Sequence, residues 1–155
     1  MDVYAKLKEL GIELPAPPPA GGLFTPIKQF ADKLVYTSGT GPFDGEGALL
    51  WGGKLGSDLT LEEGQEAAKR AALNLLALLH KDLGDLNRIK CIVKVLGFVA
   101  STPDFYDQPK VMNAASQLFI DVFGEPDGRA ARSAIGTNTL PLNMPVEIEL
   151  ILELK

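Results

Sequence analysis

The segment from Pro145 to Leu154 limits the possible folds more than any other part of the chain, because it alternates between apolar and acidic side chains. Successive side chains of a β-strand point to opposite faces, so such a segment forms a strand with one buried face. A sheet that contains this strand needs helices to cover its apolar face. The apolar positions are Val146, Ile148, Leu150, Leu152 and Leu154, and the acidic positions are Glu147, Glu149 and Glu153.

Two segments with helical periodicity can supply that cover. The first, 60–83, starts with the capping-box spacing of Thr60 and Glu63. The second, 108–123, carries Pro109 in its first turn, where proline is well tolerated. Each segment ends before a glycine, and each has an apolar stripe, namely Ala68, Ala72, Leu75, Leu76 and Leu79 in the first and Val111, Ala115, Leu118 and Val122 in the second.

The remaining strand candidates are short runs rich in branched and aromatic residues. They are 23–30 and 33–38, joined by a tight connection at Ala31-Asp32, then 89–101 and 130–137, with 48–51 as a third early strand or a bulge. This order of elements predicts an α+β fold with a mixed sheet and two helices packed on one face.

A short helix and a proline-rich arm precede this core. Asp2 can cap the helix, and Gly11 can end it in a left-handed conformation. Residues 14–22, here called the proline arm, contain three successive prolines that hold the chain extended. Too little chain precedes the arm to form a domain, so we expect one domain over 1–155, with 1–22 as a helix and an arm across its surface.

The sheet face opposite the helices is expected to stay open in a single chain. Phe98, Phe105 and several branched residues could cover that face only by association with other copies. We therefore expect a cyclic homo-oligomer in which the open faces turn toward one another.

The composition narrows the classes of partner. Its apolar fraction of 46% and charged fraction of 23% are those of an ordinary globular protein. No run approaches the roughly 18 apolar residues of a membrane span, and residues 1–10 lack the apolar centre of a secretory signal, so we expect a cytoplasmic protein without membrane contact. The net charge of −5 disfavours a nucleic-acid partner.

The single Cys91 is expected in the core, and His80 near a helix end has no second ligand to complete a metal site.

Arg132 is the residue that most strongly indicates a binding site. It lies among the small residues of 129–136, where a charged side chain is costly unless it meets an anion. Its planar guanidinium can grip a carboxylate with two hydrogen bonds. If 130–137 pairs antiparallel with the last strand, Glu147 returns toward Arg132. Arg132 then either binds a ligand or forms an ion pair with Glu147 or another acid.

The chain has no dinucleotide-binding or phosphate-loop motif and no Ser-His-Asp set.

Several short motifs follow one another in register along the chain: Tyr36-Thr37-Ser38-Gly39, Val111-Met112-Asn113-Ala114, Ala131-Arg132-Ser133, Leu140-Pro141 and Val146-Glu147-Ile148-Glu149. Together they resemble the YjgF-like family, also called the Rid (reactive intermediate deaminase, L-PSP) family, over nearly the whole chain from about residue 23 to 154. The N-terminal additions, with 54–56 and 95–99, resemble its chorismate-mutase-like branch, a label that describes a fold and not an activity.

The resemblance implies a homotrimer with three clefts, each between neighbouring subunits. It further implies that Arg132 binds the carboxylate of a small ligand and that Glu147 positions or activates a water molecule. Ser38 and Asn113 match residues that line or support the cleft. No metal or organic cofactor is implied.

Two positions depart from the family pattern. Ala134 stands where a cysteine is usual, although its backbone groups could still contact the substrate. Phe24 or Thr25 replaces a tyrosine of the first strand, which removes a possible hydrogen bond.

The activity implied by the resemblance is the hydrolysis of reactive 2-imino or enamine acids to 2-oxoacids and ammonia. Phe24 and Ile135 would be apolar walls for a short alkyl chain. The alternative is a non-catalytic or regulatory protein that binds a small carboxylate in the same cleft. A ribonuclease is disfavoured by the acidic charge and the lack of a histidine pair, and a chorismate mutase needs more cations than Arg129 and Arg132.

Overall fold

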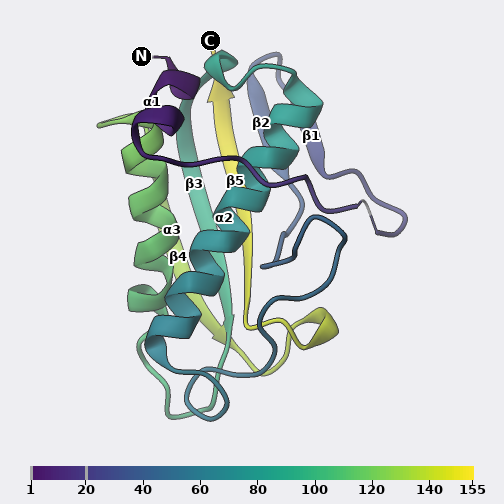
Figure 1. Cartoon of the computed structure of the whole chain (residues 1–155), viewed down its shortest axis with the longest axis vertical. Coiled ribbons are helices and arrows are strands. Elements are labelled where there is room, and N and C mark those ends of the chain that lie inside the picture. The colour runs from purple at the N-terminus through teal and green to yellow at the C-terminus, as the bar shows by residue number, and fades with distance from the viewer. Residues whose placement is uncertain (1, 20) are drawn as a thin grey trace.

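The computed structural model describes residues 2–19 and 21–155 of the chain. The helices are α1 (Val3–Glu9), α2 (Leu61–Leu83) and α3 (Gln108–Phe123), with single turns η1 (Leu86–Arg88) and η2 (Pro141–Asn143). The strands are β1 (Ile27–Phe30), β2 (Leu34–Thr37), β3 (Ile89–Ala100), β4 (Ala131–Thr137) and β5 (Val146–Leu154). They form one sheet in the order β1-β2-β5-β3-β4, and the α-helices lie on one of its faces (Figure 1).

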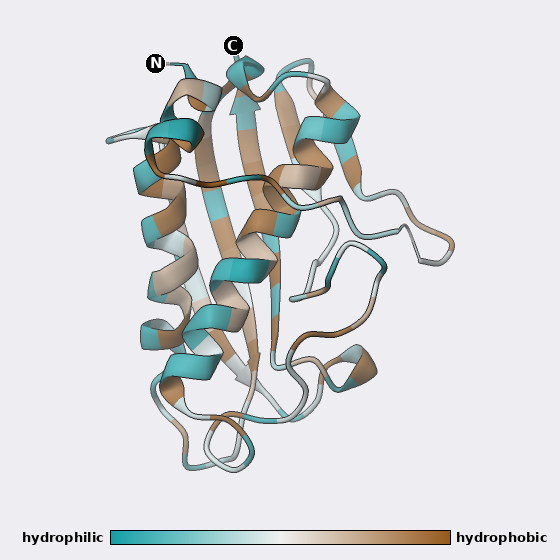
Figure 2. Cartoon of the chain, viewed as in Figure 1, coloured by the Kyte–Doolittle hydropathy of each residue, from teal (hydrophilic) through white to brown (hydrophobic). Residues whose placement is uncertain are grey.

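The central strands β3 and β5 form the core together with α2 and α3. β5 pairs antiparallel with β2 and with β3, and its residues alternate between buried and half-buried along the whole strand. Figure 2 shows that hydrophobic and hydrophilic residues follow one another along α2 and α3 as well, as in helices with one apolar face. The predicted α+β fold with two helices on one sheet face is confirmed. Fully or almost fully buried members of the core include Leu75, Leu76, Leu79, Val95, Val111, Met112, Phe119, Ile148 and Leu150.

Local sequence signals set the ends of the helices as predicted. Thr60 and Glu63 form the capping box, with the Thr60 N–H donating to the Glu63 carboxylate at 2.8 Å and the Glu63 N–H donating to Thr60 Oγ1 at 3.2 Å. The Asp2 side chain accepts from N–H groups in the first turn of α1. Gly84 and Gly124 follow α2 and α3 with φ of 79° and 73°, a conformation that glycine adopts without strain.

The first predicted strand is shorter than expected. The segment 23–30 enters the sheet only at Ile27, because Pro26 has no N–H to donate to a ladder. The Pro26 carbonyl instead accepts from the Ser38 N–H at 2.8 Å. This bond ties the segment before β1 to the end of β2.

The apolar run 48–51 does not form a strand. The Asp44 carboxylate accepts from the N–H groups of Glu46 and Ala48 at 2.9 and 2.8 Å, which folds the chain into a turn just before the run. One isolated bridge between Phe43 and Leu49 is formed instead.

β4 pairs parallel with β3 at the edge of the sheet, so the antiparallel pairing of 130–137 with the last strand, the condition for bringing Glu147 toward Arg132, is not met. β3 lies between the two, with Val95 opposite Arg132 on one side and Phe98 opposite Glu147 on the other. The 12 residues of β3 are mostly apolar and gain most from two partner strands. β4 carries arginine, serine, glycine and threonine, which suit an edge.

The sheet face opposite the helices is exposed in the single chain. Tyr36 and Ile135 keep 43% and 46% of their surface accessible. Phe105, which we expected on this face, packs against the core cluster instead, because the chain has turned back toward the helices after β3. No helix in residues 2–19 or 21–155 is both long and apolar enough to cross a membrane.

α1 is docked on the core, and the proline arm continues from it across α2 (Figure 1). Val3 and Leu7 are buried, and the Val3 N–H donates to Asn87 Oδ1 at 2.8 Å. The Tyr4 hydroxyl lies 2.9 Å from Nδ1 of His80, the residue expected near the end of α2. The arm therefore starts from a fixed point.

A buried amide holds the loop 39–47 against α2. The Asn74 side chain is fully buried, and its Nδ2 donates to the carbonyls of Gly41 and Phe43 at 3.0 and 2.9 Å. Since this loop also borders the candidate site described below, Asn74 links the core to the site.

We predict that Asn74→Ala lowers the free energy of unfolding by roughly 1–2 kcal/mol, because each buried hydrogen bond contributes about 1 kcal/mol. Urea titration would measure the loss. Glu66→Ala, at an exposed position of the same helix, is the matched control and should change stability by less than about 0.5 kcal/mol. Equal losses in the two variants would contradict the role given to Asn74.

Candidate functional site

Phe24, Ser38 and Glu147 line one cavity, here called the Glu147 cavity, with a volume of about 420 Å³. Thr25 belongs to the same neighbourhood, since its carbonyl accepts from Ser38 Oγ at 2.7 Å. Four of the residues singled out from the sequence are thus brought together, although they come from three separate segments of the chain.

Glu147 lies near the start of β5 on the open face of the sheet. A Cβ atom at position 39 would collide with its carboxylate, so Gly39 makes room for the side chain. Burial raises the pKa of Glu147, and the nearby negative charge of Glu149 raises it further. A carboxylate in such surroundings can take up and return a proton at a pH closer to neutral than an ordinary glutamate.

The rest of the cavity is mainly apolar. Its polar side chains among the described residues are Ser38, Thr40 and Glu147. The sequence did not reveal that the proline arm would form a wall, because nothing in its composition shows which surface it crosses. The apolar lining consists of Pro18, Pro19, Phe24, Pro26, Phe43, Leu78, Pro141, Leu142 and Met144.

Arg132 lies in a second cavity of about 510 Å³, at the edge strand β4. Its Nη1 donates to Asn113 Oδ1 and to Ser116 Oγ, both at 3.0 Å. Ser116 was missed in the sequence, although its position three residues after Asn113 places both side chains on one face of α3. Among the hydrogen bonds of the described residues none engages Nε or Nη2 of Arg132. Two nitrogens of the guanidinium, with three N–H groups between them, are thus left to bind a carboxylate.

Arg132 and Glu147 do not meet within one chain. Arg132 faces the helices, where it contacts α3, whereas Glu147 faces away from them, since its neighbour Ile148 is in the core. Strand spacings of about 4.8 Å and a rise of about 3.3 Å per residue place their backbones about 14 Å apart across β3. The ion pair between these two residues, one of the alternatives from the sequence, is therefore not formed, and no other described carboxylate pairs with Arg132.

Two further residues from the sequence lie outside both cavities. Ala134 is half-buried in β4 and packs against the core cluster. Ile135 is exposed on the open face. Of the two apolar walls expected from the sequence, only Phe24 lines the Glu147 cavity.

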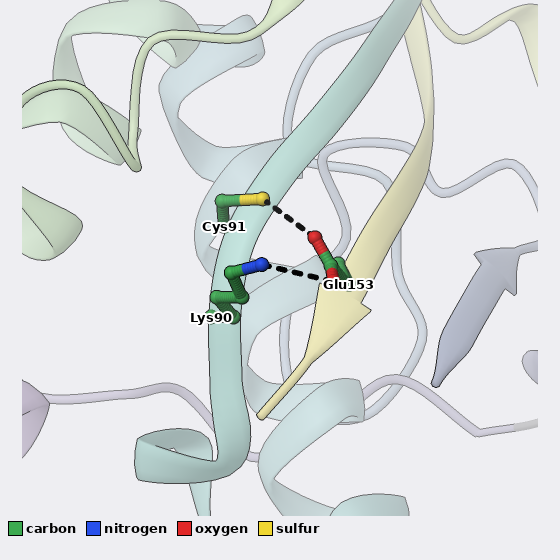
Figure 3. A network of polar contacts seen from close by, with 3 residues as sticks. All are labelled: Lys90, Cys91 and Glu153. Atoms are coloured by element: carbon green, nitrogen blue, oxygen red, sulfur yellow. Dashed lines mark hydrogen bonds and ion pairs between the residues drawn. The ribbon is translucent and has the colours of Figure 1, made fainter. Parts of the chain in front are cut away.

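The single cysteine is part of a small polar network at the start of β3 (Figure 3). Cys91 is half-buried, not fully buried as expected, and its Sγ lies 3.7 Å from Glu153 Oε2. Lys90 Nζ binds the other carboxylate oxygen of Glu153 at 3.0 Å. Burial, followed by the charge of Glu153, raises the pKa of the Cys91 thiol. A thiol that stays protonated is a poor nucleophile, so this network is not a candidate for covalent chemistry.

Comparison with known proteins agrees with this architecture. A family model described as "YjgF/chorismate_mutase-like, putative endoribonuclease" matches residues 4–154. The chain belongs to this family. Protein TCP17 of Trypanosoma cruzi is 40% identical over 153 residues, which is 98% of this chain and 94% of that protein.

Solved structures extend the comparison. A protein of Shewanella oneidensis MR-1 with the same endoribonuclease description gives a TM-score of 0.92 at 34% identity, over 99% of this chain and 100% of that one. RidA from an Antarctic Psychrobacter species gives a TM-score of 0.62 at 25% identity, over 90% and 94%. The family expected from the motifs is therefore confirmed.

We predict that Glu147→Gln stabilises the protein at neutral pH. Since burial raises the pKa of Glu147 in the folded state above its ordinary 4.5, folding favours the protonated form, and this stability is lost as the pH rises through the raised pKa. The variant should melt above wild type at pH 7, by about 2–4 °C for each kcal/mol, and the difference should close toward pH 4.

Glu153→Gln is the matched control on the same strand and face. Lys90 lowers the pKa of Glu153, so its charged form supports the fold and its loss should lower the melting temperature at pH 7. Shifts of the same sign in the two variants would contradict the burial argument for Glu147.

Proposed function

We propose that the protein hydrolyses reactive 2-imino acids, and the enamines with which they interconvert, to 2-oxoacids and ammonia. The observation that carries the proposal is the state of Arg132, which two side-chain oxygens of α3 hold in place while Nε and Nη2 have no partner in the described part of the chain. A guanidinium prepared in this way suits a planar carboxylate.

We further propose that the active site forms between subunits of a cyclic homotrimer. Within one chain Arg132 and Glu147 lie on opposite faces of the sheet, so they can act on one substrate only if they come from different copies. Arg132 is on the edge strand β4, where a neighbouring chain can approach it. Leu23 and Leu142 are fully or largely exposed near the Glu147 cavity and Phe24 is half-exposed, which supports a neighbour that covers them.

In the proposed reaction Arg132 binds the substrate carboxylate and thereby holds the imine carbon close to a water molecule. The water oxygen adds to that carbon, Glu147 takes one proton from the water, and the imine nitrogen receives this proton. The resulting carbinolamine transfers its hydroxyl proton to nitrogen through the same carboxylate. Ammonia leaves as the C–N bond breaks and the carbonyl of the 2-oxoacid forms.

A protein that binds a small carboxylate without turnover is the second candidate. It is favoured by Phe24 and Ala134, which offer neither a hydroxyl nor a thiol to the substrate. The endoribonuclease description of the family carries less weight for this chain, because the Glu147 cavity presents a carboxylate and the net charge is −5.

The decisive test is the hydrolysis of imines produced in situ by an amino-acid oxidase, in competition with trapping by semicarbazide. Arg132→Ala should lower kcat/KM about 30-fold or more, because losing a charged partner costs roughly 2–5 kcal/mol and each 1.4 kcal/mol is about tenfold in rate. Arg129→Ala is the matched control, since Arg129 borders the same cavity but forms an ion pair with Glu125. It should retain activity within about threefold.

The outcomes separate the two candidates. If wild type and Arg132→Ala are equally inactive on all imines, but wild type binds 2-oxoacids in calorimetry and Arg132→Ala does not, the binding protein replaces the enzyme. If Arg132→Ala retains full activity, the proposed role of Arg132 is wrong.

A second prediction concerns pH. The value of kcat/KM should fall as the pH drops through the pKa of Glu147, because the protonated carboxyl cannot accept a proton from water. Glu149 contributes to raising that pKa, so Glu149→Gln should move the acid limb to lower pH. Tyr36→Phe removes the hydroxyl that donates to Glu149 at 2.8 Å but keeps the charge, and should give no such shift. An acid limb that persists unchanged in Glu147→Gln would exclude Glu147 as its source.

A further inference from the structure

We propose that the Glu147 cavity is the subsite for a large apolar side chain of the substrate, branched or aromatic, and that the proline arm sets this preference. The inference rests on the proposed function for the identity of the reacting group. It replaces the short alkyl chain expected from the sequence.

The size and lining of the cavity carry the first step. Its volume of about 420 Å³ is within the range of roughly 300–1,000 Å³ typical of ligand pockets. A buried apolar cavity of about 150 Å³ already accommodates benzene. A methyl group would leave most of this space unfilled, whereas an isobutyl or benzyl group would bury apolar surface against the prolines, Phe24 and Leu78.

The direction of the substrate is the second step. The carboxylate, the side chain and the nitrogen of a 2-imino acid point in three different directions from the trigonal imine carbon. If the carboxylate is bound by Arg132 of a neighbouring copy and the imine carbon lies at Glu147, the side chain must extend away from Arg132. The lining of the Glu147 cavity, which can receive this side chain, includes Pro18 and Pro19 of the arm and Leu78 of α2.

The arm is built as a rigid wall. Pro18 is buried, and α1 anchors the arm at its start. Further along, a Cβ atom at Gly47 would lie 3.0 Å from Pro19, and one at Gly45 would lie 2.9 Å from the Ala16 Cβ, so the loop and the arm are in close contact. Because proline fixes its own backbone angle, little conformational entropy is lost when a ligand packs against this wall.

The rim of the cavity supports the same conclusion. Leu142 lines it with 74% of its surface exposed and has φ of 56° and ψ of 19°, a left-handed conformation that is unfavourable for leucine. Strained residues of this kind cluster at sites that bind ligands. Together with the half-exposed Phe24, Leu142 gives the cavity an apolar mouth.

The test compares imines derived from alanine, leucine and phenylalanine in the oxidase and semicarbazide assay. For wild type we expect kcat/KM to be about tenfold or more higher for the leucine or phenylalanine imine than for the alanine imine, because each buried methylene contributes about 0.8 kcal/mol. Gly21→Phe should lower this ratio, since no atom lies within 4 Å of a Cβ at this lining position and the ring can occupy the mouth.

A second variant keeps the test valid if Gly21→Phe does not fold. Leu142→Asn removes the apolar rim but suits the left-handed backbone, so it should fold and also lower the ratio. Ala48→Phe adds the same ring at an exposed position outside the lining and should leave the ratio unchanged.

The outcomes distinguish this inference from the proposed function. If wild type hydrolyses the alanine imine as fast as both larger ones, the subsite is wrong while the deaminase stands. If no imine is hydrolysed, the proposed function fails, and calorimetry with phenylpyruvate and pyruvate decides the subsite. The subsite is upheld if the wild type binds phenylpyruvate more tightly than pyruvate and Gly21→Phe weakens the binding of phenylpyruvate. Equal binding of phenylpyruvate and pyruvate by the wild type would overturn the subsite.

Discussion

The packing of the apolar face of β3 and β5 against α2 and α3 determines where the candidate site groups lie. Ile148 and Leu150 are fully buried, and burying a side chain of this size contributes roughly 1.5–3 kcal/mol. Because neighbouring strand residues face opposite ways, burial of Ile148 turns Glu147 to the open face, and a slip of one residue would exchange the two. The position of the acid is thus a consequence of core packing.

The same alternation places the arginine. Val95 is buried under α3, and its partner across the ladder, Arg132, faces the helices and is held by Asn113 and Ser116. The sheet therefore carries the Glu147 carboxylate on its open face. The Arg132 guanidinium, held by Asn113 and Ser116, lies at the edge of the face that the helices cover. Under the proposed function, this division makes assembly a condition of activity, since neither cavity contains both groups.

The N-terminal addition forms part of the surroundings of Glu147, although it adds no strand to the sheet. α1 is docked through Val3 and Leu7, and the proline arm reaches from there to the Glu147 cavity, where Pro18 and Pro19 form part of the wall. An extended proline segment suits this task, because it needs no ladder hydrogen bonds and keeps its shape without a partner strand. Glu147 and the apolar wall of its cavity thus come from parts of the chain that fold for different reasons.

Sequence alone determined the features that depend on neighbouring residues and on motifs: the capping box at Thr60, the one-faced strand at the C-terminus, the order of elements, the family, and the candidacy of Arg132 and Glu147. Only the tertiary structure decided that β4 pairs parallel with β3, that Arg132 and Glu147 therefore lie on different faces, and that the proline arm lines the cavity. Periodicity and capping report the local burial of a segment. Strand partners and the path of an arm are chosen by competition between surfaces far apart in the chain, for which no local pattern exists.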